Sequence, residues 1–152
     1  MRGVYETNIE ASGITVAKTL LILQAPPNQC LELYHSSVTN MNNETNEQLN
    51  CVWQKITTLG VPLGTNALQS PTETGDQAST AIASGNLTAN EPTYGTTQYG
   101  KQGYPSLGGW FYDPIPEKRF ILKPSEAAGI RLLQAPATSV DLTVSTTHRA
   151  IG

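Results

Sequence analysis

Charged residues are scarce in this chain. Of its 152 residues, 9 are Lys or Arg and 12 are Asp or Glu, so the formal net charge is −3 and only 14% of the residues are charged, against about a quarter in an average soluble domain. The positively charged residues never gather in a group larger than the pair Lys118-Arg119. Because proteins bind nucleic-acid phosphates with clustered cations, we expect no nucleic-acid partner.

Long apolar segments and helical periodicity are also missing. No segment approaches the roughly 18 apolar residues that a membrane-spanning helix needs, so we expect no membrane partner. Residues Met1–Glu6 contain one cation and then an acid, and no apolar stretch follows them, so we expect no secretion signal and a protein made in the cytoplasm. No stretch of about ten residues repeats its apolar side chains at α-helical spacing, which favours β-structure.

Only two cysteines are present, Cys30 and Cys51. They fall in two consecutive predicted strands. If these strands form a hairpin around residues 40–47, the thiols lie about 20 Å apart at ~3.4 Å per residue. A disulfide needs Cα atoms within about 7 Å, so we expect free, buried thiols.

Motifs for catalysis and for metal or cofactor binding are absent as well. The acidic residues are scattered singly, without the spacing of a general acid/base pair. There is no Gly-x-Ser-x-Gly elbow, no cluster of zinc or calcium ligands and no phosphate-binding loop among the glycines between positions 95 and 109. His35 and His148 are the only histidines, and we interpret His35 as an ordinary strand residue. The sequence therefore predicts no enzyme, no metal and no cofactor.

The chain does contain a repeated phrase. Residues 23–26 read Leu-Gln-Ala-Pro, and residues 133–136 read the same. Each copy follows an apolar run and precedes a run in which apolar and polar residues alternate. Because proline cannot donate to a strand ladder, each copy is expected to close one strand and turn the chain into the next. The repeat predicts two equivalent corners in one β architecture.

We expect residues 1–152 to form a single domain. Residues 1–16 are predicted to be an N-terminal arm and first strand, and residues 60–109, rich in glycine, to be a long loop region with short strands around 77–82 and 94–99. About eight strands separated by Gly/Pro turns are typical of a sandwich or barrel. The predicted fold is an all-β, eight-stranded jelly-roll β-sandwich with a long loop insertion in the middle.

The region around residues 94–112 interleaves glycines with aromatic residues. Aromatic side chains on an exposed loop can stack on sugar rings or anchor a protein interface. We expect the strand Trp110–Tyr112 to fill the core, and Tyr99 and Tyr104 to be exposed in a loop or an interface.

Four segments of the C-terminal third resemble single jelly-roll structural proteins of tailed bacteriophages, including capsid cement or decoration proteins that are similar in build to trimers of the tumour-necrosis-factor type. The segments are Gly109–Pro114, Lys118–Pro124, Ala128–Leu133 and Val140–Val144.

This resemblance implies a viral structural protein without enzymatic activity, made in the host cytoplasm and located on the capsid surface of the virion. It would bind the outside of an icosahedral capsid as a homotrimer and stabilise it, with itself and the major capsid protein as partners. Arg2, Tyr5, Tyr99 and Tyr104 are the predicted partner contacts.

The alternative is a carbohydrate- or receptor-binding head module of a tail spike, fibre or lectin. Jelly rolls serve that role too, and the fold does not choose between the two functions. Under this alternative the partner is a glycan, and Tyr99 and Tyr104 would contact it.

Overall fold

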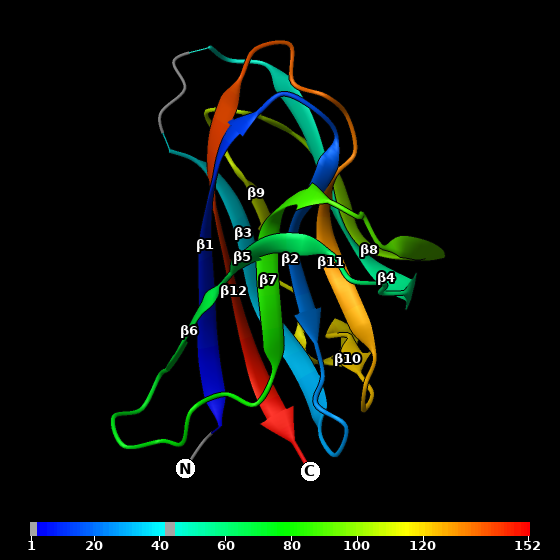
Figure 1. Ribbon diagram of the computed structural model, residues 1–152. Coiled ribbons are helices and arrows are strands. Elements are labelled where there is room, and N and C mark those ends of the chain that lie inside the picture. Colours follow the sequence, from blue (N-terminus) through cyan, green and yellow to red (C-terminus); the bar gives the residue numbers. More distant parts are fainter. Residues whose placement is uncertain (1–2, 42–44) are drawn as a thin grey trace.

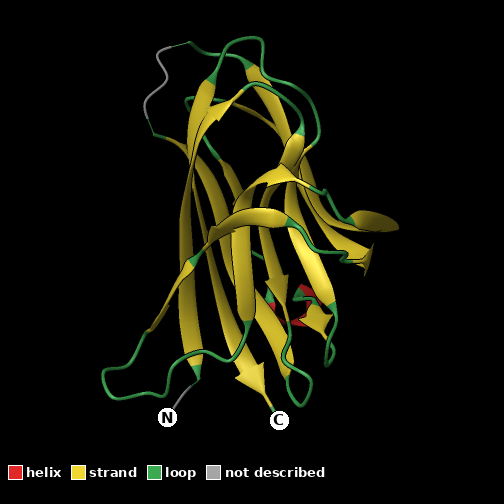
Figure 2. Cartoon of the chain, in the orientation of Figure 1, coloured by secondary structure: helices red, strands yellow, loops and turns green. Residues whose placement is uncertain are grey.

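The computed structural model describes residues 3–41 and 45–152, and it is an all-β sandwich of two antiparallel sheets (Figure 1). Strands cover most of the described chain, and the one helical segment in it is a short 3₁₀ turn, η1 (Pro116–Lys118) (Figure 2). The structure therefore confirms the predicted all-β class. The described residues form twelve strands, more than the eight predicted.

Each sheet has six strands. The first, sheet A, has the order β10 (Ile121–Leu122), β3 (Cys30–Asn40), β12 (Val140–Ile151), β1 (Val4–Ile14) and β6 (Leu68–Pro71), with β9 (Trp110–Tyr112) also paired to β3. The second, sheet B, has the order β5 (Leu63–Asn66), β7 (Ile82–Ala89), β2 (Lys18–Gln24), β11 (Ala127–Leu132), β4 (Gln48–Thr58) and β8 (Thr93–Pro105).

The repeated Leu-Gln-Ala-Pro phrase forms two equivalent corners, as predicted. The first copy takes the chain from β2 to β3 and the second from β11 to β12, and both connections cross from sheet B to sheet A. Since β2 pairs antiparallel with β11, and β3 with β12, the two corners lie at opposite ends of the sandwich, one at the bottom and one at the top of Figure 1.

The core lies between the two sheets, and strand alternation fills it. Along β12, buried and half-buried residues alternate from Val140 to His148, as expected when one face of a strand is covered. Strand β2 is buried at every position of residues 19–23, because it lies between β7 and β11 and a small apolar cluster covers its outer face. That cluster contains Ile22, Leu87 and Ala127, with Ile56 and Leu59 packed against it.

The prediction that residues 60–109 are mainly a long loop is wrong, although the short strand expected around 94–99 falls within β8; the one expected around 77–82 is a loop up to the start of β7 at Ile82. Four strands, β5 to β8, lie there, and β8 is the longest strand described, with 13 residues. The glycines in this region allow close packing. A Cβ atom on Gly64 would lie 2.5 Å from the carbonyl oxygen of Gly85, and one on Gly85 would lie 2.4 Å from that of Leu20. These glycines therefore let neighbouring backbones approach.

Two details of β3 also differ from expectation. The strands that hold Cys30 and Cys51, β3 and β4, lie in opposite sheets instead of forming a hairpin. Both thiols are free; Cys51 is buried, as predicted, while Cys30 is half-buried. A bulge in the pairing with β12 falls between Leu33 and His35, so His35 does not share the inward face of Leu33, as strict alternation along a strand would require.

Candidate functional site

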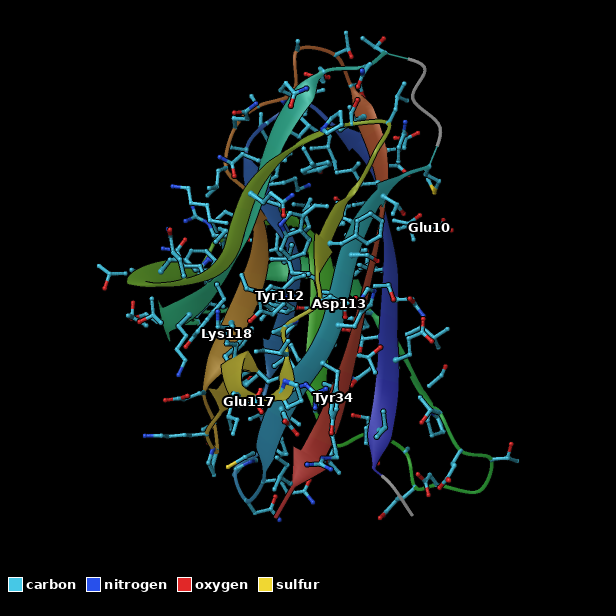
Figure 3. All side chains as sticks on the ribbon, turned by 180° about the vertical axis from the view of Figure 1, so that it is seen from behind. Glu10, Tyr34, Tyr112, Asp113, Glu117 and Lys118 are labelled. Atoms are coloured by element: carbon cyan, nitrogen blue, oxygen red, sulfur yellow. The ribbon has the colours of Figure 1, made fainter. Side chains whose placement is uncertain are left out.

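The candidate functional site is a cleft where the edges of the two sheets separate. It lies between β8 of sheet B and the segment of β9 and η1 beside sheet A, and its volume is about 540 Å³. Figure 3 looks toward this side and shows Tyr112, Asp113 and Lys118 grouped there, with Glu10 on β1 at the opposite edge. The lining residues are Gln98, Tyr99, Gly100, Gln102, Phe111, Tyr112, Asp113, Pro114 and Lys118.

Aromatic rings connect the cleft to the core. The ring of Tyr99 stacks on Phe120 with centroids 4.3 Å apart and planes 8° apart. Phe120 in turn contacts Tyr112 at 6.1 Å and the buried Trp53 at 5.6 Å. The indole Nε1 of Trp110 donates to the carbonyl oxygen of Gly100 over 2.8 Å. These contacts hold the half-buried rings of Tyr99 and Tyr112 in fixed positions on the wall of the cleft.

Polar groups surround these rings at the rim. Gln98 and Gln102 are exposed residues of β8, and an Asp113 carboxylate oxygen lies 3.3 Å from Nδ1 of His35. The Tyr112 hydroxyl donates to the carbonyl oxygen of Lys118 over 3.4 Å. Burial, and to a lesser extent Tyr99, raises the pKa of Tyr112, so this hydroxyl stays a neutral donor. Amides, a carboxylate, an ammonium group and apolar rings together can bind a polar ligand with a flat apolar face.

The outer face of sheet A next to the cleft carries small hydroxyl side chains between exposed apolar ones. Leu68 is 69% exposed at one edge, while Phe111 and Ile121, at 52% and 46%, lie at the other. The hydroxyl residues between them are Ser37, Thr39, Thr143, Ser145 and Thr147. These three exposed apolar side chains lie at the two edges of one face, and such a face can serve association.

A charged cluster lies on the same face. Glu32 accepts a hydrogen bond of 2.9 Å from Arg149 Nη2, and its other oxygen lies 3.7 Å from Arg119 Nη1. The Arg119 guanidinium sits 4.0 Å from the centroid of the Tyr34 ring, an arrangement that favours cation–π attraction. With one carboxylate between two guanidiniums, the cluster has a net positive charge.

The structure separates the predicted contact residues. Arg2 lies outside the described residues. Tyr5 is buried, and its hydroxyl donates to the carbonyl oxygen of Gln77 over 3.0 Å. Tyr104 is 1% exposed, so its predicted exposure is wrong: its pairing with Leu49 in β4 turns the ring into the core. Only Tyr99 lines the cleft.

Sequence reasoning missed the other half of the cleft. We expected Trp110–Tyr112 to fill the core, with either Trp110 and Tyr112 or Phe111 facing inward. Trp110 is fully buried, Tyr112 is half-buried and Phe111 is exposed, in line with the first of these and with the alternation of a strand. Nothing local in the sequence indicates that β9 lies next to β8.

Comparison with known protein families, curated proteins and solved structures finds no match to this chain. Within residues 3–41 and 45–152, no helix is long and apolar enough to span a membrane. In the same ranges, no three potential metal-ligating side chains gather in one place.

Proposed function

We propose that this protein is a viral structural protein of the cement or decoration type, which binds the outside of an icosahedral capsid as a homotrimer and stabilises it. The observation that carries the proposal is the outer face of sheet A, where Phe111, Ile121 and Leu68 stay exposed beside a flat row of hydroxyl side chains. Such a face gains free energy when a partner covers it. The protein works by adhesion and not as an enzyme.

The strand pairing supports a jelly-roll topology for this role. Strand β1 pairs with β12, β2 with β11, β3 with both β9 and β10, and β4 with β8. These are the pairs expected when one long antiparallel hairpin is wound into two sheets, as in jelly rolls of eight strands. In this interpretation β5, β6 and β7 are additions between the fourth and fifth strands of the roll.

Low charge fits the proposed mode of binding. The hydroxyl groups of sheet A can bridge to polar groups of a capsid subunit, while the apolar side chains at the edges exclude water. Salt screens ionic contacts, whereas a surface of hydroxyl and apolar groups still binds its partner at high salt. Many copies on one shell act together, so that modest contacts per subunit add up. The protein is then made in the host cytoplasm and resides on the capsid surface.

The test combines sizing and capsid binding. The wild-type protein is expected to run as a trimer and to sediment with purified capsid shells. The double variant Phe111→Ser, Ile121→Ser is expected to weaken both properties at least tenfold. Val61→Ser is the matched control, because Val61 is an exposed apolar residue outside sheet A. A wild-type chain that stays monomeric and does not sediment with shells would contradict the proposal.

A second candidate, glycan binding, is favoured by the cleft itself. The rings of Tyr99 and Tyr112 can stack on a sugar ring, and the amides of Gln98 and Gln102 can bond its hydroxyls. A glycan array with the isolated protein tests this function. Binding that is lost in the variant Gln98→Ala, Gln102→Ala and kept in Thr97→Ala, an exposed change in the same strand, would support it. An array without binding would exclude it.

A further inference from the structure

The interior of the sandwich contains a polar layer at the end where β1 begins and β12 ends. His148 is 0% exposed, and neither of its ring nitrogens has a hydrogen-bond partner among the described residues. The hydroxyl of the buried Thr7 has no partner there either. Gln69 donates from Nε2 to the carbonyl oxygen of Ala81 over 2.8 Å, yet its own buried Oε1 has no partner among these residues. Buried polar groups without a partner are rare and costly.

Strand register brings these three residues together. Tyr5 lies opposite His148 in the β1–β12 pairing, and Thr7 lies opposite Gln69 in the β1–β6 pairing. Tyr5 and Thr7 are two residues apart and share the inward face of β1, so Thr7 is the diagonal neighbour of His148, roughly 7–8 Å away between Cα atoms. Thr7 on β1 therefore lies between His148 on β12 and Gln69 on β6, at the edge of sheet A.

Among the residues that the structure describes, no charged side chain faces His148 from the elements packed around it. On β1, its inward neighbours are Tyr5, which stacks on the imidazole at 5.6 Å, and Thr7. On β3, the residue paired with His148 is Leu33. The charged residues of the three strands alternate with these inward ones and so face outward; they are Glu6, Glu10, Glu32, Asp141 and Arg149.

The covering elements add no charge to this layer. Strand β7, which packs on β1 from sheet B, has no ionisable residue, and neither has β6. The nearest loop carries Asp76, whose carboxylate accepts the backbone N–H of Gly3 at 3.3 Å. That loop lies beyond the Tyr5 ring, because the Tyr5 hydroxyl donates to its residue Gln77. Burial alone lowers the pKa of His148 to about 4.

We propose that His148, Thr7 and Gln69 form an acid-sensitive latch that holds β1 and the short edge strand β6 against β12. With neutral His148 the layer is closed. When the imidazole takes up a proton from solvent, the resulting cation finds no acceptor and no counter-charge among the described residues of the interior, so it gains hydration by releasing the β1–β6 edge. One consequence rests on the proposed capsid-binding function: acid would loosen the face of sheet A that binds the capsid.

The direction of the pH effect follows from the two protonation states. A solvated histidine titrates near pH 6.5, whereas His148 in the closed layer binds its proton only near pH 4. Stability from the neutral histidine is therefore fully present above about pH 6.5 and is lost as the pH falls toward 4. Relative to neutral pH, the equilibrium constant that favours the closed form over the open form is expected to fall about 30-fold at pH 5.0 and about 300-fold below pH 4.

Hydrogen exchange read by mass spectrometry tests the latch. The exchange of the Val4–Ile14 segment is divided by that of Gln48–Thr58 in the same sample, which removes the intrinsic pH dependence. This ratio is expected to rise about 30-fold between pH 7.5 and 5.0 in the wild type and in His35→Gln, which removes the other, half-buried histidine. In His148→Gln it should not change with pH. A flat ratio in the wild type, or an unchanged rise in His148→Gln, would overturn the proposal.

A second measurement covers the case in which His148→Gln does not fold. In the wild-type protein, the ring proton shifts of His148 are followed by NMR from pH 7.5 downward. The imidazole is expected to stay neutral at pH 5.0 in the closed form, and a His148 ring that protonates near pH 6.5 in the closed form would refute the latch. Neither measurement needs a capsid or a trimer, so failure of the latch and failure of the capsid-binding function are distinguishable.

Discussion

The ring of Tyr112 packs directly against the backbone of Gly100. A Cβ atom on Gly100 would lie 2.4 Å from Cδ2 of Tyr112, and Gly100 has a φ of +62°. The absence of a side chain at position 100 thus places Tyr112 flat on the wall of the cleft, while the Gly100 carbonyl oxygen accepts the Trp110 indole N–H. One glycine of β8 positions two aromatic residues of β9.

The substitution Gly100→Ala is expected to lower the free energy of unfolding by about 2–4 kcal/mol, since it adds left-handed backbone strain and a clash with Tyr112. Denaturant unfolding measures this loss. Gly60→Ala is the control: Gly60 has nearly the same φ, +64°, but nothing within 4 Å of the added atom, so it should lose only about 1–2 kcal/mol. Equal losses in both variants would mean that the Tyr112 contact is unimportant.

The core contains a hydrogen-bonded polar pair that supports Trp53. The indole Nε1 of Trp53 donates to the Ser36 hydroxyl over 2.8 Å, and Ser36 and Thr146 lie 2.8 Å apart. Ser36→Ala leaves the buried indole N–H unpaired and is expected to cost about 1–3 kcal/mol of unfolding free energy. Ser37→Ala, at the adjacent half-buried position, should stay within about 0.5 kcal/mol of the wild type. Thermal or denaturant unfolding of both variants checks the difference.

Glu32 holds two guanidiniums on the outer face of sheet A. In Glu32→Gln, Arg119 and Arg149 lose the carboxylate between them and repel each other, so we expect a loss of about 1–3 kcal/mol of unfolding free energy. Glu10→Gln, which removes an exposed carboxylate of β1, should change the stability by less than about 0.5 kcal/mol. Chemical denaturation at neutral pH compares the two; a Glu32→Gln variant as stable as Glu10→Gln would contradict the structural role of the cluster.

The two thiols are expected to differ in reactivity. Burial raises the pKa of Cys51 to about 12, and because the thiolate is the reactive form, Cys51 should resist alkylation in the folded protein. With iodoacetamide at pH 8, intact-mass spectrometry should show at most one adduct per native chain and two after unfolding. Cys30→Ala should remove the native adduct. Modification of Cys51 at the same rate before and after unfolding would argue against its burial.

How far the sequence predicts this fold depends on whether the information is local. The two Leu-Gln-Ala-Pro corners were predictable, because an apolar run, a proline and an alternating run are each recognised within a few residues. Strand β7 was missed and β8 was predicted only as a short strand around 94–99, because their glycines serve contacts with Gly64, Leu20 and Tyr112, partners distant in the sequence. A single sequence does not distinguish a glycine that avoids a clash from a glycine that makes a turn.

The candidate site shows the same division. Tyr99 and Tyr104 both belong to the Gly/Tyr stretch of β8, and the sequence suggested the same exposed role for both. The structure buries Tyr104 in the core and places Tyr99 at the cleft. The pairing with β4 places Tyr104 opposite Leu49 and Tyr99 opposite Trp53, so both rings are on the inward face of β8. Which of the two is fully covered depends on how the other sheet fits over β8.

The sequence by itself determined that this protein is built from strands, has its two corners at the repeated phrase and contains a core of alternating apolar residues, because these properties depend on side-chain periodicity and on proline. Only the tertiary structure decided which strands pair, which tyrosine reaches the surface and that the buried ring nitrogens of His148 have no hydrogen-bond partner among the described residues. These features depend on the pairing of segments far apart in the chain, and one residue of register is enough to reverse the direction in which a side chain points.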